Sequence, residues 1–429
     1  MRSTESTSRS GLALLMREYG LIRLPARWLF GPFNVGGMNM KWSTLALMVT
    51  CVVLMIGSAL AQGTDVPGDN NGDKIVSADE VAAAEKLAQE GKLSADDLQE
   101  IKHIHEKYPI NITDSANRTV TIYKPVKRLI SQGTFAHEAI FLLKAQDRLV
   151  ALTSTAQQVY EFIPGIKEKP SIGDYREVDY EKVIESRPDV YILGSNRTLP
   201  DVEKKLEPLG TTIVVLGFSK MNMFEKEFRT LARLLEEDEK VEEYLGWRNG
   251  YLKMIQENTA DLAQKPRVYV EYPGWDWKTP INYEVVSMAG GFNIGSTLNK
   301  TSTSSVEVIS PEWVLTQNPE LIILPAFVDT VTDFTGYHVN SPDNAKKFIA
   351  DMSNRTGFKN IDAVKNGRLY VLDGETGSAC RGVIGVCYCA KWFYPDIFKD
   401  LNPDEINREY FEKWLGASYK GVWAYPQAS

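Results

Sequence analysis

The chain has 429 residues, of which 43% are hydrophobic and 24% are charged, a composition typical of a globular protein long enough for two domains. Its formal net charge is −8, and residues 1–61 hold six basic and two acidic side chains, so the remainder carries about −12. Because nucleic-acid recognition needs clustered Lys and Arg, this acidic body argues against a nucleic-acid-binding protein.

An export signal is predicted near the N-terminus. Lys41 precedes an apolar run from Leu45 to Ile56, and an Ala-Leu-Ala sequence ends at Ala61. A basic flank, a run of this length and such an ending are typical of a secretory signal cleaved after Ala61. An uncleaved membrane anchor is the alternative, although the run is short for a membrane span. We therefore expect an exported protein, periplasmic or at the cell surface, with an upstream extension and signal peptide in residues 1–61.

An acidic loop opens the next segment, residues 62–109, which has a helical pattern. Oxygen donors stand at positions 1, 3, 5, 7, 9 and 12 of a twelve-residue loop, namely Asp69, Asn71, Asp73, the carbonyl of Ile75, Ser77 and Glu80. This spacing suits the oxygen ligands of Ca²⁺, although Lys74 replaces the Gly expected at position 6. The segment resembles a single dockerin-type calcium hand, without the second loop of a dockerin. Calcium binding and a solvated acidic turn without metal both remain open.

The zone from residue 110 to 223 alternates short apolar runs with helical patterns. Strands are predicted at residues 119–123, 128–131, 149–153, 190–193 and 212–216, and helices at 137–143, 178–186 and 202–209. Strands separated by helices of this length indicate a parallel sheet with right-handed crossovers.

A long helical pattern follows in residues 224–265, with an acidic cluster at residues 236–238 that is expected to divide it. The zone from 266 to 425 then repeats the α/β alternation. Its predicted strands are 267–271, 321–324 and 369–372, and its predicted helices are 311–316 and 343–352. The predicted fold is therefore α/β, with two Rossmann-like lobes joined by a long rigid helix and a small N-terminal helical segment. A strut of this kind predicts only a small closure on ligand binding.

Catalytic signatures are missing from the sequence. It contains no G-x-S-x-G, H-E-x-x-H or Walker sequence and no G-x-G-x-x-G that opens a helix. His103 and His105 lie two residues apart on a predicted helix and cannot share one face. The sequence therefore does not indicate an enzyme.

One pattern occurs in both α/β zones. Residues 179–193 place Glu181 in a helix that ends before Pro-Asp and a strand, and residues 310–324 place Glu312 in a helix that ends before Pro-Glu and a strand. In both zones the helix Glu lies eight positions before the acidic residue that leads into the strand.

Together with the sequences Gly-Asp-Tyr-Arg at 173–176 and Ala-Gly-Gly-Phe-Asn at 289–293, this repeat resembles the periplasmic-binding family for iron siderophores, haem and vitamin B12. The resemblance covers residues 110–423. It implies a monomeric solute-binding protein of an ABC importer, which captures an iron-siderophore, haem or corrinoid ligand between two lobes and delivers it to a permease and its ATPase. It implies neither enzymatic activity nor a required cofactor, and Ca²⁺ at the N-terminal loop is an optional addition.

The resemblance implies that Glu181 and Glu312, one on each lobe, meet arginines on two permease subunits. Two well-separated charges fix the register of a complex and speed encounter more than they add affinity. The alternative is that both are ordinary glutamates in the first turn of a helix, where the helix dipole favours negative charge.

The resemblance also implies a ligand site between the lobes, at the loops that follow the strands. Its candidate residues are Thr134, Phe135, Tyr175 and Arg176 from the first lobe and Trp275, Trp277 and Arg381 from the second. The Trp side chains suit the flat face of a macrocycle, or they pack under their own loop. The Arg side chains suit ligand carboxylates or catecholates, or they form salt bridges within the protein.

Two other functions remain as alternatives. A metal-chelatase-like enzyme on the same fold would need metal ligands at the cleft, where His137 and His338 are the available histidines. A calcium-dependent surface scaffold module would act through the N-terminal loop.

Overall fold

The computed structural model describes residues 66–274, 276–300, 305–327, 333–377 and 380–427, so the predicted signal peptide lies outside the described residues. Two helices follow the acidic loop as the sequence predicts, α3 (Ala78–Gln89) and α4 (Ala95–Lys107). The Ser77 hydroxyl accepts the Glu80 backbone N–H, and the Glu80 carboxylate accepts the Ser77 N–H in return. Ser94 caps α4 through the Asp97 N–H. Both helices therefore begin at side chains that satisfy otherwise free N–H groups.

The first lobe contains a parallel four-stranded sheet in the order β4-β3-β5-β6. Its strands are β3 (Leu129–Ser131), β4 (Leu149–Leu152), β5 (Val190–Leu193) and β6 (Thr212–Val215). Its helices are α5 (Thr134–Leu142), α6 (Ser154–Val159), α7 (Tyr180–Glu185) and α8 (Leu199–Leu206). Nearly all strand residues are buried, as expected for a sheet covered by helices on both faces.

The strand predicted at residues 119–123 lies outside this parallel sheet. It is β2 (Thr119–Ile122), which pairs antiparallel with β1 (Ile110–Thr113) in a separate hairpin. Residues 114–118 connect the two strands, and this link is too short for the crossover that a parallel pairing requires.

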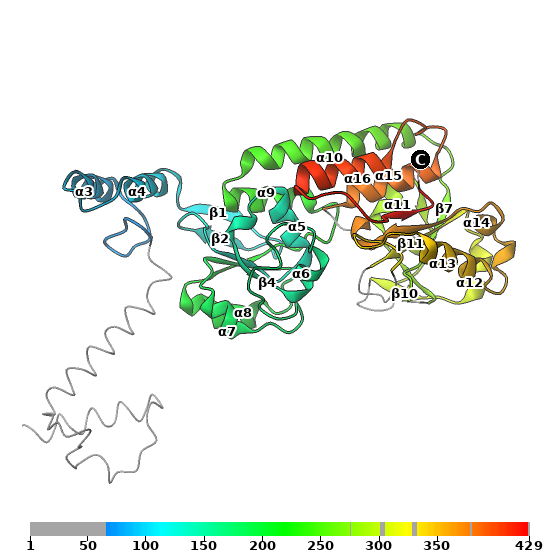
Figure 1. Cartoon of the computed structure of the whole chain (residues 1–429), viewed down its shortest axis with the longest axis horizontal. Coiled ribbons are helices and arrows are strands. Elements are labelled where there is room, and N and C mark those ends of the chain that lie inside the picture. Colours follow the sequence, from blue (N-terminus) through cyan, green and yellow to red (C-terminus); the bar gives the residue numbers. More distant parts are fainter. Residues whose placement is uncertain (1–65, 275, 301–304, 328–332, 378–379, 428–429) are drawn as a thin grey trace, which may run out of the picture. The chain divides into compact units, whose positions relative to one another are not determined.

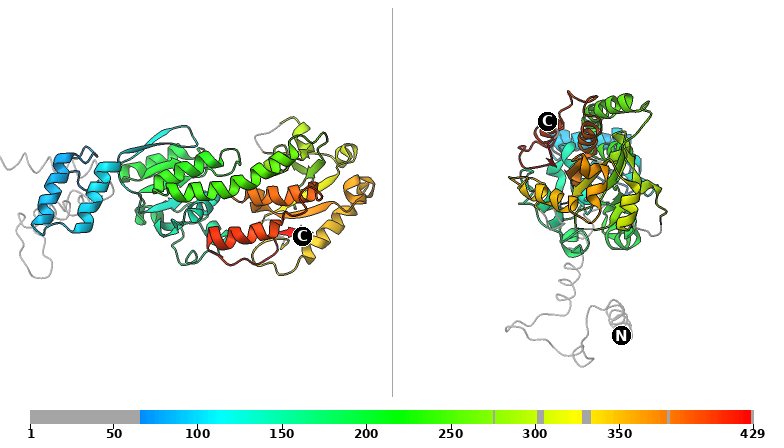
Figure 2. Two further views of the ribbon diagram at one scale, coloured as in Figure 1. Left: turned by 90° about the horizontal axis from the view of Figure 1, so that it is seen from above. Right: turned by 90° about the vertical axis from the view of Figure 1, so that its right-hand side faces the viewer.

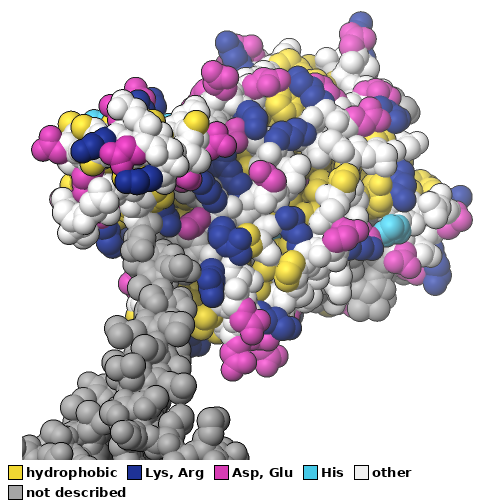
Figure 3. Space-filling view, turned by 60° about the vertical axis from the view of Figure 1, so that its left-hand side comes forward, with side chains coloured by type: hydrophobic (Ala, Val, Ile, Leu, Met, Phe, Trp, Pro, Cys, Tyr) yellow, Lys and Arg dark blue, Asp and Glu magenta, His cyan; other side chains and the backbone are white. Residues whose placement is uncertain are grey.

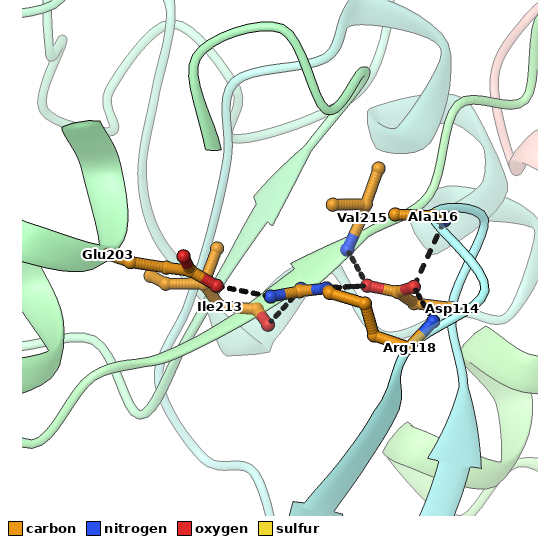
Figure 4. A network of polar contacts seen from close by, with 6 residues as sticks. All are labelled: Asp114, Ala116, Arg118, Glu203, Ile213 and Val215. Carbon is orange, nitrogen blue, oxygen red and sulfur yellow. Dashed lines mark hydrogen bonds and ion pairs between the residues drawn. The ribbon is translucent and has the colours of Figure 1, made fainter. Parts of the chain in front are cut away.

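Side chains from the turn of this hairpin cover the free edge of β6 (Figure 4). The Asp114 carboxylate accepts the Val215 N–H at 3.2 Å, and Arg118 donates to the Ile213 carbonyl at 3.0 Å. Arg118 also forms ion pairs with Asp114 and Glu203. These side chains occupy backbone groups that an uncovered edge strand would offer to another chain.

Two helices lead from the first lobe to the second. They are α9 (Phe224–Leu235) and α10 (Asp238–Thr259), and Glu236 separates them in the left-handed conformation with φ 55°. The predicted break at residues 236–238 is therefore confirmed. The 22 residues of α10 span about 33 Å and contact α5 of the first lobe and α11 and α15 of the second. Figures 1 and 2 show α10 running along both lobes.

The second lobe contains a five-stranded sheet in the order β13-β12-β11-β7-β9, with β13 antiparallel to β12 and the other pairs parallel. Its strands are β7 (Arg267–Val270), β9 (Phe292–Asn293), β11 (Leu321–Ala326), β12 (Leu369–Asp373) and β13 (Ala424–Tyr425). A separate antiparallel pair is formed by β8 (Lys278–Pro280) and β10 (Val306–Val308). The helices are α11 (Glu284–Met288), α12 (Pro311–Gln317), α13 (Asp343–Ser353), α14 (Asp362–Lys365), α15 (Gly382–Phe393) and α16 (Pro403–Glu409), and a π-helical turn spans Tyr410–Leu415.

The predicted fold class is confirmed, because two α/β lobes are joined by a long helix. The largest cluster of buried apolar side chains runs without interruption from Ile104 in α4 through Phe141 in α5 and Tyr244 in α10 to Val386 in α15. The lobes therefore share one core along the connecting helix, in addition to the smaller core of each sheet.

We expect Asp114→Ala to lower the free energy of unfolding by about 2–4 kcal/mol, because the buried carboxylate also accepts the N–H groups of Ala116 and Arg118. Urea unfolding followed by circular dichroism measures the change. Glu203→Ala is the matched control: its side chain is 30% exposed, and its ion pair with Arg118 should be worth less than about 1 kcal/mol. Equal effects of the two substitutions would contradict the proposed role of Asp114.

Candidate functional site

Several predicted ligand residues lie where the parallel strands of the first lobe end. Thr134 opens α5 three residues after β3, and Gln132 in the same connection donates to the Tyr175 carbonyl at 2.7 Å. Tyr191 in β5 donates to the Gln132 side chain at 3.1 Å. These bonds bring the Tyr175 loop to the carboxyl edge of the sheet, where α/β proteins commonly bind ligands.

Tyr175 and Arg176 lie together on this loop. The Asp174 carboxylate accepts the Thr155 hydroxyl at 2.6 Å and the Arg176 N–H at 2.9 Å, and the Thr155 hydroxyl is the main cause that lowers the pKa of Asp174. Arg176 is exposed, and its guanidinium carbon lies 4.8 Å from the centroid of the Tyr175 ring. The loop therefore presents a cation and an aromatic ring side by side.

Phe135 contacts the second lobe through its backbone. Its ring is half-buried, and its carbonyl accepts the Cys380 thiol at 3.6 Å.

Trp277 packs within the second lobe. Its ring meets Phe358 edge to face with centroids 5.8 Å apart, and the Arg355 guanidinium lies 4.9 Å from its centroid. Arg355 also pairs with the buried Glu271 at 2.7 Å. These contacts correspond to the alternative that Trp277 packs under its own loop. Trp275 lies outside the described residues.

Arg381 lies in a buried ion pair between the lobes. It is 2% exposed, and its Nε donates to Glu138 Oε1 at 2.5 Å. Its Nη1 lies 3.8 Å from the Asp373 carboxylate, and burial raises the pKa of Asp373 to about 6. This is the salt bridge considered as the alternative role of Arg381, so contact with a ligand would require the pair to open.

Glu138 is the main residue of this network that the sequence analysis missed. It is fully buried in α5 and also accepts the hydroxyls of Tyr410 at 2.7 Å and Tyr160 at 3.4 Å. One signal was available, because Glu138 is the single charged residue in the apolar sequence from Thr134 to Leu143. A charge in such a helix indicates a buried partner.

His137 and His338, the histidines that the metal-chelatase alternative would use, have other contacts. Burial lowers the pKa of His137 to about 4, and its Nδ1 lies 3.0 Å from the Gly133 carbonyl. His338 contacts Glu161 instead. Among the described residues, no group of three or more His, Cys, Asp and Glu side chains is placed to hold a metal ion.

The acidic N-terminal loop is closed by its own hydrogen bonds. Asp69 accepts the N–H groups of Gly72 and Lys74, both at 2.8 Å, and Glu80 accepts the Asn70 N–H at 2.7 Å. Asn71 and Asp73 accept the N–H groups two residues further along the chain. Lys74 adopts the left-handed conformation with φ 68° that favours Gly at this position. Calcium binding stays a prediction.

The two predicted docking residues occupy equivalent places. Glu181 is the second residue of α7 and Glu312 is the second residue of α12, and both are exposed. Hydrogen bonds from its own backbone and from Ser310 lower the pKa of Glu312 and keep it charged.

An arginine holds each of these helices in the same way, a correspondence that the sequence analysis missed. The Arg128 guanidinium donates to the Ser186 and Arg187 carbonyls at the end of α7, and Arg267 donates to the Gln317 carbonyl at the end of α12. Asp189 accepts the Arg128 N–H at 2.9 Å, and Glu320 accepts the Arg267 N–H at 2.8 Å. Asp189 and Glu320 are the acidic residues eight positions after Glu181 and Glu312. Each therefore connects the chain after the helix to the arginine at the start of the first strand in that lobe's sheet.

A cavity of about 400 Å³ lies away from all the predicted ligand residues. It is bounded by the β1–β2 hairpin, the start of β5 and β6, and the acidic loop through Lys74. On the face of the molecule drawn in Figure 3, Lys and Arg side chains are interspersed with Asp and Glu. Two charged side chains that line the cavity form ion pairs, Arg118 with Glu203 and Lys124 with Asp189. Neither therefore supplies an uncompensated charge for a ligand.

The family model described as "Periplasmic binding protein" matches residues 129–376, more than half of the chain and parts of both lobes. The chain belongs to this family. It is a substrate-binding protein of the ABC-transporter type, consistent with an extracytoplasmic location. Within the described ranges, the structure has no helix with the length and apolar character needed to cross a membrane.

Curated relatives match almost their whole length. The chain is 24% identical over 327 residues to an uncharacterized ABC transporter substrate-binding lipoprotein, YvrC of Bacillus subtilis, covering 74% of this chain and 96% of the relative. It is 20% identical to the molybdate-binding protein MolA of Haemophilus influenzae, covering 72% and 92%. The TroA-like periplasmic binding protein FepB from Veillonella parvula has a similar structure, with a TM-score of 0.63, 22% identity and coverage of 74% and 99%.

Proposed function

We propose that the chain captures a metal chelate, such as a ferric siderophore, haem or a corrinoid, and delivers it to the permease and ATPase of an ABC importer. The observation that carries the choice of ligand is the pair formed by the half-buried Tyr175 ring and the exposed Arg176 guanidinium at the carboxyl edge of the first sheet. An aromatic face beside a guanidinium suits ligands that combine flat rings with carboxylate or catecholate oxygens.

A bare oxyanion is the second candidate ligand, because the relative MolA is named for binding molybdate. A guanidinium binds tetrahedral oxyanions and carboxylates by similar hydrogen bonds, whereas an oxyanion has no surface for an aromatic ring. Tyr175 therefore favours the chelate.

Delivery would use Glu181 and Glu312. Each exposed carboxylate lies in the first turn of a short helix, and a neighbouring arginine ties the end of that helix to its sheet. Fixed, well-separated charges on two lobes suit a partner with two basic sites at a set spacing.

We expect Arg176→Ala to weaken binding of the cognate chelate at least about 10-fold, because a charged hydrogen bond to a ligand contributes more than about 1.4 kcal/mol. Isothermal titration with ferric siderophores, haem, cobinamide and molybdate measures the affinities. Lys182→Ala, which removes an exposed cation from α7 nearby, is the control and should leave them unchanged. Saturable binding that is insensitive to Arg176→Ala would place the ligand elsewhere, and saturation by molybdate alone would favour the oxyanion.

The paired substitution of Glu181→Arg and Glu312→Arg should abolish stimulation of the cognate transporter's ATPase in lipid nanodiscs and leave chelate affinity unchanged, because the two charges act only in docking. Glu257→Arg in α10 together with Lys347→Glu in α13 reverses exposed charges outside α7 and α12 and should keep stimulation within about two-fold of the unmodified protein. Full stimulation by the Glu181 and Glu312 variant would show that these residues are ordinary first-turn glutamates.

A further inference from the structure

The buried arginine at the lobe interface has an incomplete set of partners. The Nε of Arg381 binds Glu138, whereas its Nη2 is buried and forms no hydrogen bond. Three aromatic rings, those of Phe162, Phe411 and Trp423, lie 5.5 to 5.6 Å from the guanidinium carbon. A buried guanidinium with an unused donor is costly unless another group can occupy that donor.

We propose that Glu138 is an internal counter-anion for Arg381. The ion pair of these two residues, the latch, holds the lobes together in the ligand-free protein, and an anionic group of the ligand displaces Glu138 from Arg381. The latch depends only on the contacts described above, whereas the displacement rests on the proposed function. The ligand group that competes would carry carboxylate, catecholate or other anionic oxygens, because these are the groups that a guanidinium binds in place of a carboxylate.

The position of the pair in the chain makes it a link between the lobes. Glu138 lies in α5 of the first lobe, and Arg381 immediately precedes α15 of the second. Both side chains are at most 2% exposed, so their attraction is screened far less than that of a surface pair. Separating them would leave two buried charges without their main partner, which opposes movement of the lobes.

Displacement by a ligand avoids this penalty. Glu138 would keep the hydroxyl donors of Tyr410 and Tyr160, and Arg381 would exchange one anionic partner for another. The unused Nη2 gives an incoming anion an additional donor once the pair begins to open. The same residue pair would therefore hold the ligand-free protein together and select for ligands that carry negative charge.

The latch is tested by the distance between the lobes in the ligand-free protein. Spin labels on Lys204→Cys in α8 and Lys347→Cys in α13 report this distance by double electron–electron resonance, since the cysteines in the described part of the chain are buried. We expect a narrow distribution in the parent protein and a broader or longer one with Glu138→Gln. Glu138→Asp, which keeps the charge and shortens the side chain, should give an intermediate result if Glu138→Gln folds poorly.

Glu161→Gln is the matched control, because Glu161 pairs with His338 on the other lobe at a more exposed position. This substitution should leave the distance distribution unchanged. A distribution for Glu138→Gln that is identical to that of the parent protein would overturn the latch.

The displacement is tested with a ferric catecholate and with molybdate as probes in isothermal titration. We expect Glu138→Gln to bind the effective probe at least 10-fold more tightly than the parent protein, because the internal competitor is gone. Equal or weaker binding by the variant would overturn the displacement. Failure of both proteins to bind either probe would overturn displacement by catecholate or oxyanion groups. The proposed function is tested separately by the wider ligand set used for Arg176→Ala, and the distance measurement would still decide the latch.

Discussion

Helix α10 contacts both lobes, and the shared apolar core beside it is the constraint on which the rest of the molecule depends. Because a single stiff helix joins the lobes and is packed on both, large relative rotations would expose buried apolar surface at about 25 cal/mol per Å². The carboxyl edge of the first sheet, which carries Tyr175 and Arg176, is thereby kept in a limited range of positions. This packing supports the prediction of a small closure on ligand binding.

Charge is used differently at the surface and in the interior of this acidic protein. Glu181 and Glu312 are exposed, so they contribute little to folding and are accessible for the docking role proposed for them. Glu138 and Arg381 are buried, where an unpaired charge is expensive and a paired one restricts which arrangements of the lobes are allowed. Arg128 and Arg267 link the surface to the interior. Each binds the end of the helix that carries an exposed Glu and holds that helix against the sheet of its lobe.

The sequence predicted the architecture because its information is local and periodic. Strand β5 begins and ends where the apolar run does, and the acidic cluster at 236–238 marks the break before α10. The equivalence of Glu181 and Glu312 followed from one repeated spacing. The hairpin β1–β2 was not predicted as a separate sheet, because pairing depends on the length of the connection between strands and not on apolar pattern alone.

The candidate site was less predictable, because burial and long-range pairing decide its chemistry. Arg381 could be placed near the second lobe's strands from its position in the chain, but its partner Glu138 is 243 residues away. Trp277 similarly meets Arg355 and Phe358, which only the folded chain brings to it. Contacts between residues so far apart in the chain leave no periodic pattern in a single sequence. The one available sign was Glu138, a lone charge in an apolar helix.

Native mass spectrometry tests the central claim most directly. The chain without residues 1–61 would be incubated with the small-molecule fraction of medium in which the source organism has grown. The protein would then be desalted and measured under non-denaturing and denaturing conditions. A capture protein should retain one small molecule per chain under non-denaturing conditions and release it on denaturation, with the released mass and isotope pattern of a metal chelate. A chain that retains no small molecule from any fraction, or binds only a macromolecule, would contradict a role in solute capture.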